Sequence, residues 1–265
     1  MKLIIKTIRT AAFACAVFSL ASCSNEDAPS TNSQEDIIPE EYLNISYQGK
    51  NYSNVPTAYD ENGDFIFLDN EFSKIYEDEL AGLNTLSINL VDDSSIEIYK
   101  TLDENLQNHG IAAMPISTGN DLQTRTVVSP SQNYLGKVEL WDDRNFKDTY
   151  WDFGILKATD PYEVNNLNKS FKFNDKCSSL ILSNYIPNDS TKELDMGSYT
   201  LPYSEATLVF IGYENDGFGG DTYTLFANAG EVKRHERLKG FNDKLSSFKL
   251  FYVQKDTYKD EGLNI

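Results

Sequence analysis

A six-residue sequence occurs twice in the C-terminal half of the chain and constrains the fold more than any other feature. Residues 174–179 read NDKCSS and residues 242–247 read NDKLSS, so the copies differ only at the fourth position. Each copy follows a phenylalanine, Phe173 or Phe241, and leads into an apolar run. This repetition indicates an internal duplication, and therefore a domain built from two similar halves.

A second repeated element precedes each hexapeptide. Residues 138–148 (VELWDDRNFKD) and 210–220 (FIGYENDGFGG) each contain an aromatic residue, then an acid, turn-forming residues and a phenylalanine. Each element leads into a further aromatic stretch, at residues 149–153 and 222–226. Aromatic residues make up 12% of the chain, and aromatic enrichment favours strands over helices. Both halves are therefore predicted to be β-structure.

Together these elements resemble the βγ-crystallin family, over roughly residues 135–253. Motifs of that family begin with an aromatic residue and an acid, and its calcium-binding members carry Asn/Asp-Asn/Asp-x-x-Ser/Thr-Ser in each motif. The resemblance implies a mainly β protein, in which residues 134–253 form a two-motif Greek-key sandwich. It also implies two Ca²⁺ ions held between the motifs.

The same resemblance implies that each calcium site is shared, with a fifth-position hydroxyl from one loop and the acid and carbonyls from the other motif. The candidate ligands are Asp142, Asp175, the Lys176 carbonyl, Ser178, Glu214, Asp243, the Lys244 carbonyl and Ser246. Ca²⁺ takes about six to eight oxygen ligands of these kinds. The alternative is a pair of ordinary Asn-Asp turns whose serine hydroxyls satisfy the backbone.

The chain departs from the family pattern in three places. Asp148 occupies a position where the family uses glycine for a positive φ angle. Asp142 replaces a longer glutamate, which shortens the reach of that ligand. Residues 188–204 are expected to form an inserted connection, because the hexapeptides lie further apart than in the family.

The first residues indicate an export signal rather than a folded element. Positively charged residues precede a short apolar run at residues 11–20, and the sequence LASC, ending at Cys23, resembles the lipobox of bacterial lipoproteins. The resemblance implies cleavage of residues 1–22 and acylation of Cys23 with palmitate and other chains, which anchors the protein to a membrane. An ordinary secretory signal with a chance cysteine is the alternative.

The residues after Cys23 read as a flexible tether, up to residue 40. They are rich in Ser, Asn, Asp, Glu and Pro and have few apolar residues, a composition that does not build a core. Ser24 resembles the signal for outer-membrane sorting, and Glu26-Asp27 resemble the surface-export signal of some lipoproteins. The expected location is therefore the outer membrane. Exposure at the cell surface is a separate expectation, whose alternative is that the acids only keep the tether soluble.

Residues 41–116 are predicted to form a small α+β domain, and the sequence does not indicate its role. A linker follows at 117–133, and residues 254–265 form a tail. The first strand alternates Leu43, Ile45 and Tyr47 with polar residues, and the expected elements include a hairpin at Asn62-Gly63, a helix over 72–80 and a helix capped by Thr101.

The same segment contains a pattern that partly resembles an EF-hand calcium loop. Acids and an amide occupy several EF-hand positions: Asp60, Asn62, Asp64 and Glu71. Phe65 stands where that loop needs glycine, so a hairpin explains the pattern better.

The charge and the residue supply exclude several classes of function. The chain has 23 Lys and Arg against 41 Asp and Glu, a net charge of −18, which argues against nucleic-acid binding. Only two histidines are present, so a histidine zinc site or a Ser-His-Asp triad is poorly supplied. Cys177 is the one cysteine beyond the signal and the lipobox, and it is predicted to be a core residue rather than a nucleophile.

These features predict a lipid-anchored, calcium-binding protein of the cell envelope that acts as a binding or structural module. The alternative is a peptidase inhibitor built on a crystallin-like fold. No catalytic residues are predicted, and the chain is not expected to be an enzyme. A glycan or protein ligand is left open, since Trp141 and Trp151 could stack on sugars but more often such residues fill a core.

The lipobox generates a direct test. Labelled palmitate should be incorporated into the wild-type protein in cells and should not be incorporated into Cys23→Ala, because the variant lacks the thiol that carries the lipid. Gel fluorography of membrane fractions measures this difference. Equal labelling of both proteins would contradict lipid anchoring at Cys23.

Overall fold

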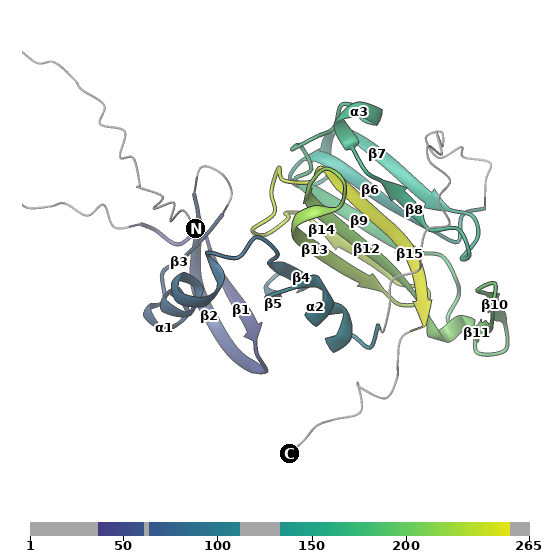
Figure 1. The fold of residues 1–265 in the computed structure, drawn as a ribbon, viewed down its shortest axis with the longest axis horizontal. Coiled ribbons are helices and arrows are strands. Elements are labelled where there is room, and N and C mark those ends of the chain that lie inside the picture. Colours follow the sequence, from purple (N-terminus) through teal and green to yellow (C-terminus); the bar gives the residue numbers. More distant parts are fainter. Residues whose placement is uncertain (1–36, 61–63, 112–132, 255–265) are drawn as a thin grey trace, which may run out of the picture. The chain divides into compact units, whose positions relative to one another are not determined.

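The computed structural model describes residues 37–60, 64–111 and 133–254, which belong to one compact unit. The predicted signal peptide, Cys23, most of the tether and almost all of the linker and the tail lie outside the described residues. Asn62-Gly63 of the expected hairpin also lie outside them. The described chain is mainly β, as predicted (Figure 1). No helix in these described ranges has the length and apolarity needed to cross a membrane.

The N-terminal segment contains both helices and strands. Its elements are β1 (Glu41–Tyr47), β2 (Lys50–Tyr59), β3 (Phe65–Phe67), α1 (Asn70–Ile75), a π-helical turn η1 (Tyr76–Leu80), β4 (Ser87–Asp92), β5 (Ser95–Tyr99) and α2 (Leu102–Asn108). The helix predicted over 72–80 is thus α1 with its π-helical continuation. Thr101 caps α2 as predicted, because its hydroxyl accepts a hydrogen bond from the Glu104 N–H.

The C-terminal segment holds the two predicted halves. The first half comprises β6 (Gly136–Asp143), β7 (Lys147–Ile155), β8 (Tyr162–Val164), α3 (Leu167–Phe171) and β9 (Ser179–Asn184). The second comprises β12 (Ala206–Asn215), β13 (Gly219–Ala227), β14 (Val232–His235) and β15 (Ser247–Gln254). The connection expected at 188–204 contains a small two-stranded sheet, β10 (Glu193–Asp195) and β11 (Thr200–Pro202), followed by a 3-10 turn η2 (Tyr203–Glu205).

The two halves exchange their third strands. One sheet has the order β14-β9-β6-β7, so β14 of the second half pairs with β9 of the first. The other sheet contains β13-β12-β15-β8, so β8 of the first half pairs with β15 of the second. The two halves therefore have equivalent strand orders, and neither half completes a sheet alone.

The N-terminal segment extends one of these sheets. β4 pairs in parallel with β13, which produces a nine-stranded sheet with the order β3-β2-β1-β5-β4-β13-β12-β15-β8. Buried polar side chains tie this seam together. The Asn105 amide of α2 donates to the hydroxyls of Ser87 and Thr224, at 2.9 Å each, and Thr222 donates to Ser87 at 2.8 Å. The segments predicted as separate domains therefore share a ladder and a hydrogen-bond network.

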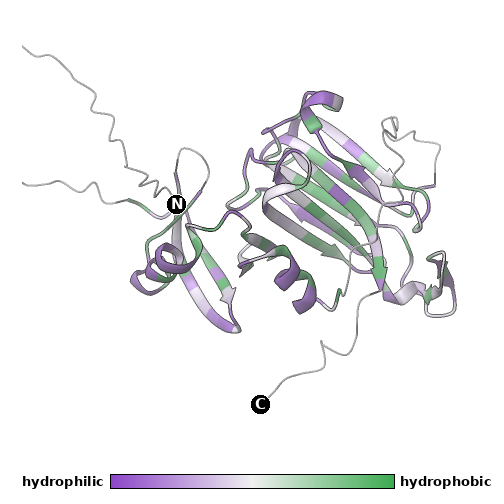
Figure 2. Ribbon diagram, viewed as in Figure 1, coloured by the Kyte–Doolittle hydropathy of each residue, from purple (hydrophilic) through white to green (hydrophobic). Residues whose placement is uncertain are grey.

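The N-terminal segment also buries a face that the first half leaves partly open. In β6, the buried Val138 and Leu140 alternate with half-buried Lys137 and Glu139. In β12, the whole stretch Ala206–Tyr213 is buried. Alternate β12 residues enter the main core, and the others pack with Leu106 of α2 and Ile111. Figure 2 shows the resulting apolar colouring along the central strands, with hydrophilic helices around them.

A buried histidine, His235, should make the stability of the protein depend on pH. His235 is 2% exposed, and burial lowers its pKa from the ordinary 6.5 to about 4. The unfolded chain therefore binds a proton below about pH 6.5 while the folded chain does not, so stability falls with decreasing pH. The expected loss is roughly 2 kcal/mol at about pH 5. Urea unfolding at neutral and acidic pH measures it, and His235→Leu should reduce the loss. An identical loss in the variant would exclude His235 as its source.

Candidate metal centre

Each hexapeptide forms a tight turn with its aspartate in the left-handed region. The φ angles are 51° at Asp175 and 56° at Asp243, a conformation that aspartate and asparagine adopt more readily than most residues. The preceding asparagine braces the turn in both copies: Asn174 Nδ2 donates to Asp175 Oδ2 at 2.5 Å, and Asn242 Nδ2 donates to Asp243 Oδ2 at 2.7 Å. The duplicated sequence thus folds into the same local structure twice.

The two turns contact each other reciprocally. The hydroxyl of Ser178 donates to Asp243 Oδ1 at 2.7 Å, and the hydroxyl of Ser246 donates to Asp175 Oδ1 at 3.1 Å. Backbone bonds repeat the exchange, since Asp175 N–H donates to the Leu245 carbonyl and Asp243 N–H to the Cys177 carbonyl. We call these contacts the Ser178–Asp243 pair and the Ser246–Asp175 pair. Each brings a hydroxyl from one half to a carboxylate of the other.

The sixth position of each hexapeptide secures the neighbouring hairpin. The Ser179 hydroxyl donates to the Asp143 carbonyl at 2.7 Å and accepts from the Phe146 N–H at 3.1 Å. Ser247 makes the equivalent bonds, to the Asn215 carbonyl at 2.6 Å and from the Phe218 N–H at 3.1 Å. Both serines are fully buried. The β6–β7 and β12–β13 hairpins are therefore folded over the two turns.

The two first-strand acids lie in equivalent irregularities of the hairpins. The strand register shifts between Trp141 and Asp143 and again between Tyr213 and Asn215. Bulges of this kind redirect side chains, and the residues they contain are Asp142 and Glu214. Asp142 Oδ2 lies 3.6 Å from the Lys176 ammonium. Glu214 Oε2 instead accepts a long hydrogen bond, 3.4 Å, from the Asp221 N–H.

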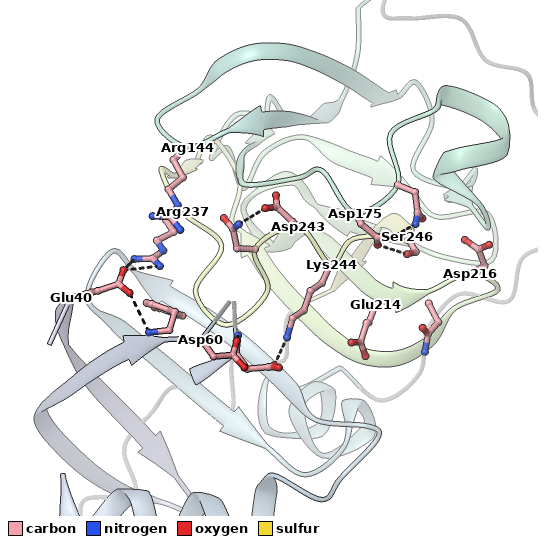
Figure 3. A pocket seen from close by; sticks show the side chains of 15 residues that line it. Glu40, Asp60, Arg144, Asp175, Glu214, Asp216, Arg237, Asp243, Lys244 and Ser246 are labelled. Atoms are coloured by element: carbon pink, nitrogen blue, oxygen red, sulfur yellow. Dashed lines mark hydrogen bonds and ion pairs between the residues drawn. The ribbon is translucent and has the colours of Figure 1, made fainter. Parts of the chain in front are cut away.

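The turns open into a polar groove of about 1200 Å³ (Figure 3). Seven carboxylates line it against three basic side chains. Asp175, Glu214, Asp243, Lys244 and Ser246 of the predicted set line this groove, whereas Asp142, Lys176 and Ser178 do not. The N-terminal segment contributes three of the carboxylates: Glu40, Asp60 and Asp64.

Asp221, a partly buried neighbour of the groove, has a raised pKa. Burial, and then the carboxylates of Glu214 and Asp64, raise the pKa of Asp221 to about 6. The opposing hydrogen bond from the Leu86 N–H, at 2.8 Å, does not cancel this effect. The Lys244 ammonium also opposes the rise, so burial is the main cause and the two carboxylates add to it.

The oxygen donors suit a hard cation, although no cluster of three Asp, Glu, His or Cys side chains with metal-holding geometry occurs in the described ranges. Asn174 Oδ1 and Asn242 Oδ1 are buried without a hydrogen-bond partner. An unsatisfied buried acceptor costs about 1–3 kcal/mol, and a cation would satisfy it. The two halves leave the same orphaned atom, at the first position of each hexapeptide. The residues present therefore fit calcium through mixed hydroxyl, amide, carbonyl and carboxylate ligands.

Some residues of this site were not among the predicted ligands. These residues are Asn174 and Asn242, and their shared place at the first position of both repeats is the sequence feature that marks them. Cys177 has no exposed surface and packs in the core, as predicted. Burial raises the pKa of its thiol above the ordinary value, which disfavours the reactive thiolate.

Comparison with solved structures finds βγ-crystallin domains, the family that the sequence resembles. A domain described in work on the evolution of the eye-lens fold is 18% identical, over 49% of this chain and 98% of that one, with a TM-score of 0.29. A βγ-crystallin from Ciona intestinalis is 20% identical, over 46% and 100%, with a TM-score of 0.25. A double mutant of a βγ-crystallin domain from Clostridium beijerinckii is 23% identical, over 43% and 96%, with a TM-score of 0.26. A clostrillin double mutant is described in complex with nickel. No family model and no curated protein matches the chain.

The hairpins generate a prediction about Asp148. Its φ is 62°, and the equivalent residue of the second half is Gly220, with a φ of 80°. Asp148→Gly should stabilise the protein by about 0.5–1 kcal/mol, because glycine adopts this conformation without a Cβ penalty. Thermal unfolding measures the change. Thr149→Gly, one residue further along β7, is the control and should destabilise. A lower midpoint for Asp148→Gly would show that its side chain outweighs the backbone strain.

Proposed function

We propose that this protein is a lipid-anchored calcium-binding module of the cell envelope. The observation that carries the proposal is the reciprocal approach of Ser178 to Asp243 and of Ser246 to Asp175. Two oxygens about 3 Å apart can both lie about 2.4 Å from one Ca²⁺ ion. Each pair thus supplies two of the oxygen ligands of one Ca²⁺ ion, and the duplication supplies two such pairs.

Each site then combines residues from both halves. The Ser178 hydroxyl would act with Asp243, the Lys244 carbonyl and Glu214, all from the second half. The Ser246 hydroxyl would act with Asp175, the Lys176 carbonyl and Asp142, all from the first. Each set has two carboxylates, which favours a divalent cation, and leaves positions for water. Because each ion would contact both halves, calcium would crosslink them.

Anchoring rests on the lipobox ending at Cys23. Loss of residues 1–22 removes three positive charges and no acid, so the mature chain has a net charge of −21, from 20 basic and 41 acidic residues. A strongly acidic chain outside the cell has access to calcium at concentrations that suit extracellular modules, which bind with dissociation constants of about 10⁻⁴–10⁻³ M.

Calcium should raise the thermal midpoint, and a chelator should lower it. An ion that binds only the folded state at about 100 times its dissociation constant adds about 2.7 kcal/mol per site. Ser178→Ala and Ser246→Ala should each lose most of one site's increment, while Asp175→Asn and Asp243→Asn should lose at least as much because they also remove charge. Magnesium should stabilise weakly, since it requires a small octahedral shell.

The quantity to compare is the rise of the thermal midpoint on adding calcium. The midpoint without calcium also changes in the serine variants, because each serine makes a hydrogen bond that the variant loses. Ser170→Ala, on the exposed surface of α3, is the matched control and should keep the full increment. Calorimetric titration measures the number of ions bound. No binding heat and no midpoint shift at millimolar calcium would refute calcium binding.

A further inference from the structure

The two halves differ in what the lysine of the hexapeptide contacts. Lys176 lies 3.6 Å from Asp142, the first-strand acid of its own half. The equivalent Lys244 does not pair with the equivalent acid, Glu214, which has no ion pair among the described residues. Its ammonium instead binds Asp64, a residue of the N-terminal segment that lines the groove. The two sites therefore differ because of Asp64, which lies 180 positions before Lys244 in the sequence.

The N-terminal segment holds the second loop firmly enough to fix this difference. Arg237 donates from both terminal nitrogens to Glu40, at 3.2 Å, and its guanidinium lies 3.7 Å from the centre of the Tyr59 ring. Lys239, which is 6% exposed, binds Glu41. Gly240 has a φ of 67° and lies against the Phe65 ring so closely that a Cβ would overlap it. These contacts come directly before the second hexapeptide.

Two of the acids that resembled part of an EF-hand loop, Asp60 and Asp64, line this groove. Asp64 N–H donates to Asp60 Oδ1 at 2.9 Å, and Asp60 N–H donates to the Asp64 carbonyl at 3.0 Å, which is the geometry of a chain reversal between β2 and β3. Glu40, Asp60 and Asp64 add negative charge to the groove, whereas its three basic side chains all come from the C-terminal segment. The N-terminal segment therefore makes the groove more attractive to a cation.

We propose that Asp64 is a positioning residue for the second cation loop: it holds the Lys244 ammonium away from Glu214 and makes the Ser178–Asp243 site the tighter of the two. An ammonium paired with a carboxylate ligand competes with an incoming cation, as Lys176 does at Asp142. Asp64 removes that competitor from Glu214 and adds a carboxylate to the groove. The inference rests on the calcium binding proposed above and assigns a role to the N-terminal segment.

Calcium titration of the full chain, fitted to two sites, tests the proposal. Asp64→Asn should weaken one site by about fivefold or more, and Asp64→Glu should restore it. The weakened site is identified in a Ser178→Ala background, where Asp64→Asn should have no further effect on the remaining site. Glu71→Gln is the matched control, because it also removes one carboxylate and one exposed ion pair, with Lys50, from the same segment.

Two lysine variants separate positioning from a general effect of charge. In a Lys244→Met background, Asp64→Asn should weaken calcium binding much less, because the competing ammonium is gone. Lys176→Met should strengthen the Ser246–Asp175 site, because it frees Asp142.

The outcomes distinguish the two proposals. If the wild type binds no calcium, both are wrong. If the wild type binds two ions and Asp64→Asn behaves like Glu71→Gln, calcium binding stands and the role of Asp64 is wrong. Equal weakening of both sites, or the same effect of Asp64→Asn with and without Lys244, would also overturn the positioning role.

Discussion

The contact between the two hexapeptide turns is the constraint on which the C-terminal fold depends. Each turn gives its hydroxyl to the carboxylate of the other and exchanges a backbone bond with it. The strands that flank the turns, β8 with β15 and β14 with β9, are exchanged in the same sense. A half on its own would lack a strand and leave its aspartate without the facing serine. The duplication therefore closes one core, and its polar centre lies where the halves cross.

That centre is built from small polar groups, each with a separate task. The fifth-position serines face the aspartates of the other half, while the buried sixth-position serines hold the hairpins above the turns. The asparagines brace the aspartates and keep one oxygen unsatisfied. A buried polar cluster is stabilising only when its members are satisfied. The orphaned oxygens and the surplus of carboxylates are what give the arrangement its preference for a cation.

The N-terminal segment makes the two halves unequal. It pairs with β13, covers the outer face of β12 with α2, and contacts the loop that leads into the second hexapeptide. In the first half the equivalent strand, β7, is the last strand of its sheet in the part of the chain that the structure describes. The N-terminal segment therefore packs on the second half only, and the two hexapeptide lysines have different partners: Lys244 faces Asp64, whereas Lys176 faces Asp142.

Most of the local structure of this protein was predictable from patterns of neighbouring residues. Alternating residues predicted β1, helical spacing predicted α1, Thr101 marked the start of α2, and the repeats located both polar turns, since each of these depends on neighbours a few residues apart. The continuous apolar run Leu208–Ile211 is also typical of a strand buried on both faces, as β12 is. Short elements such as β8, α3 and β14 gave no comparable pattern.

Which distant segments meet became visible only in the folded chain. The parallel pairing of β4 with β13, the packing of α2 and the partner of Lys244 join residues more than 100 positions apart. Such contacts depend on the shape and charge of assembled surfaces, and any of the many acids in this chain could have paired with that lysine. The hexapeptides therefore fixed where the candidate ligands lie in the sequence, and the packing of the N-terminal segment decided how the two sites differ.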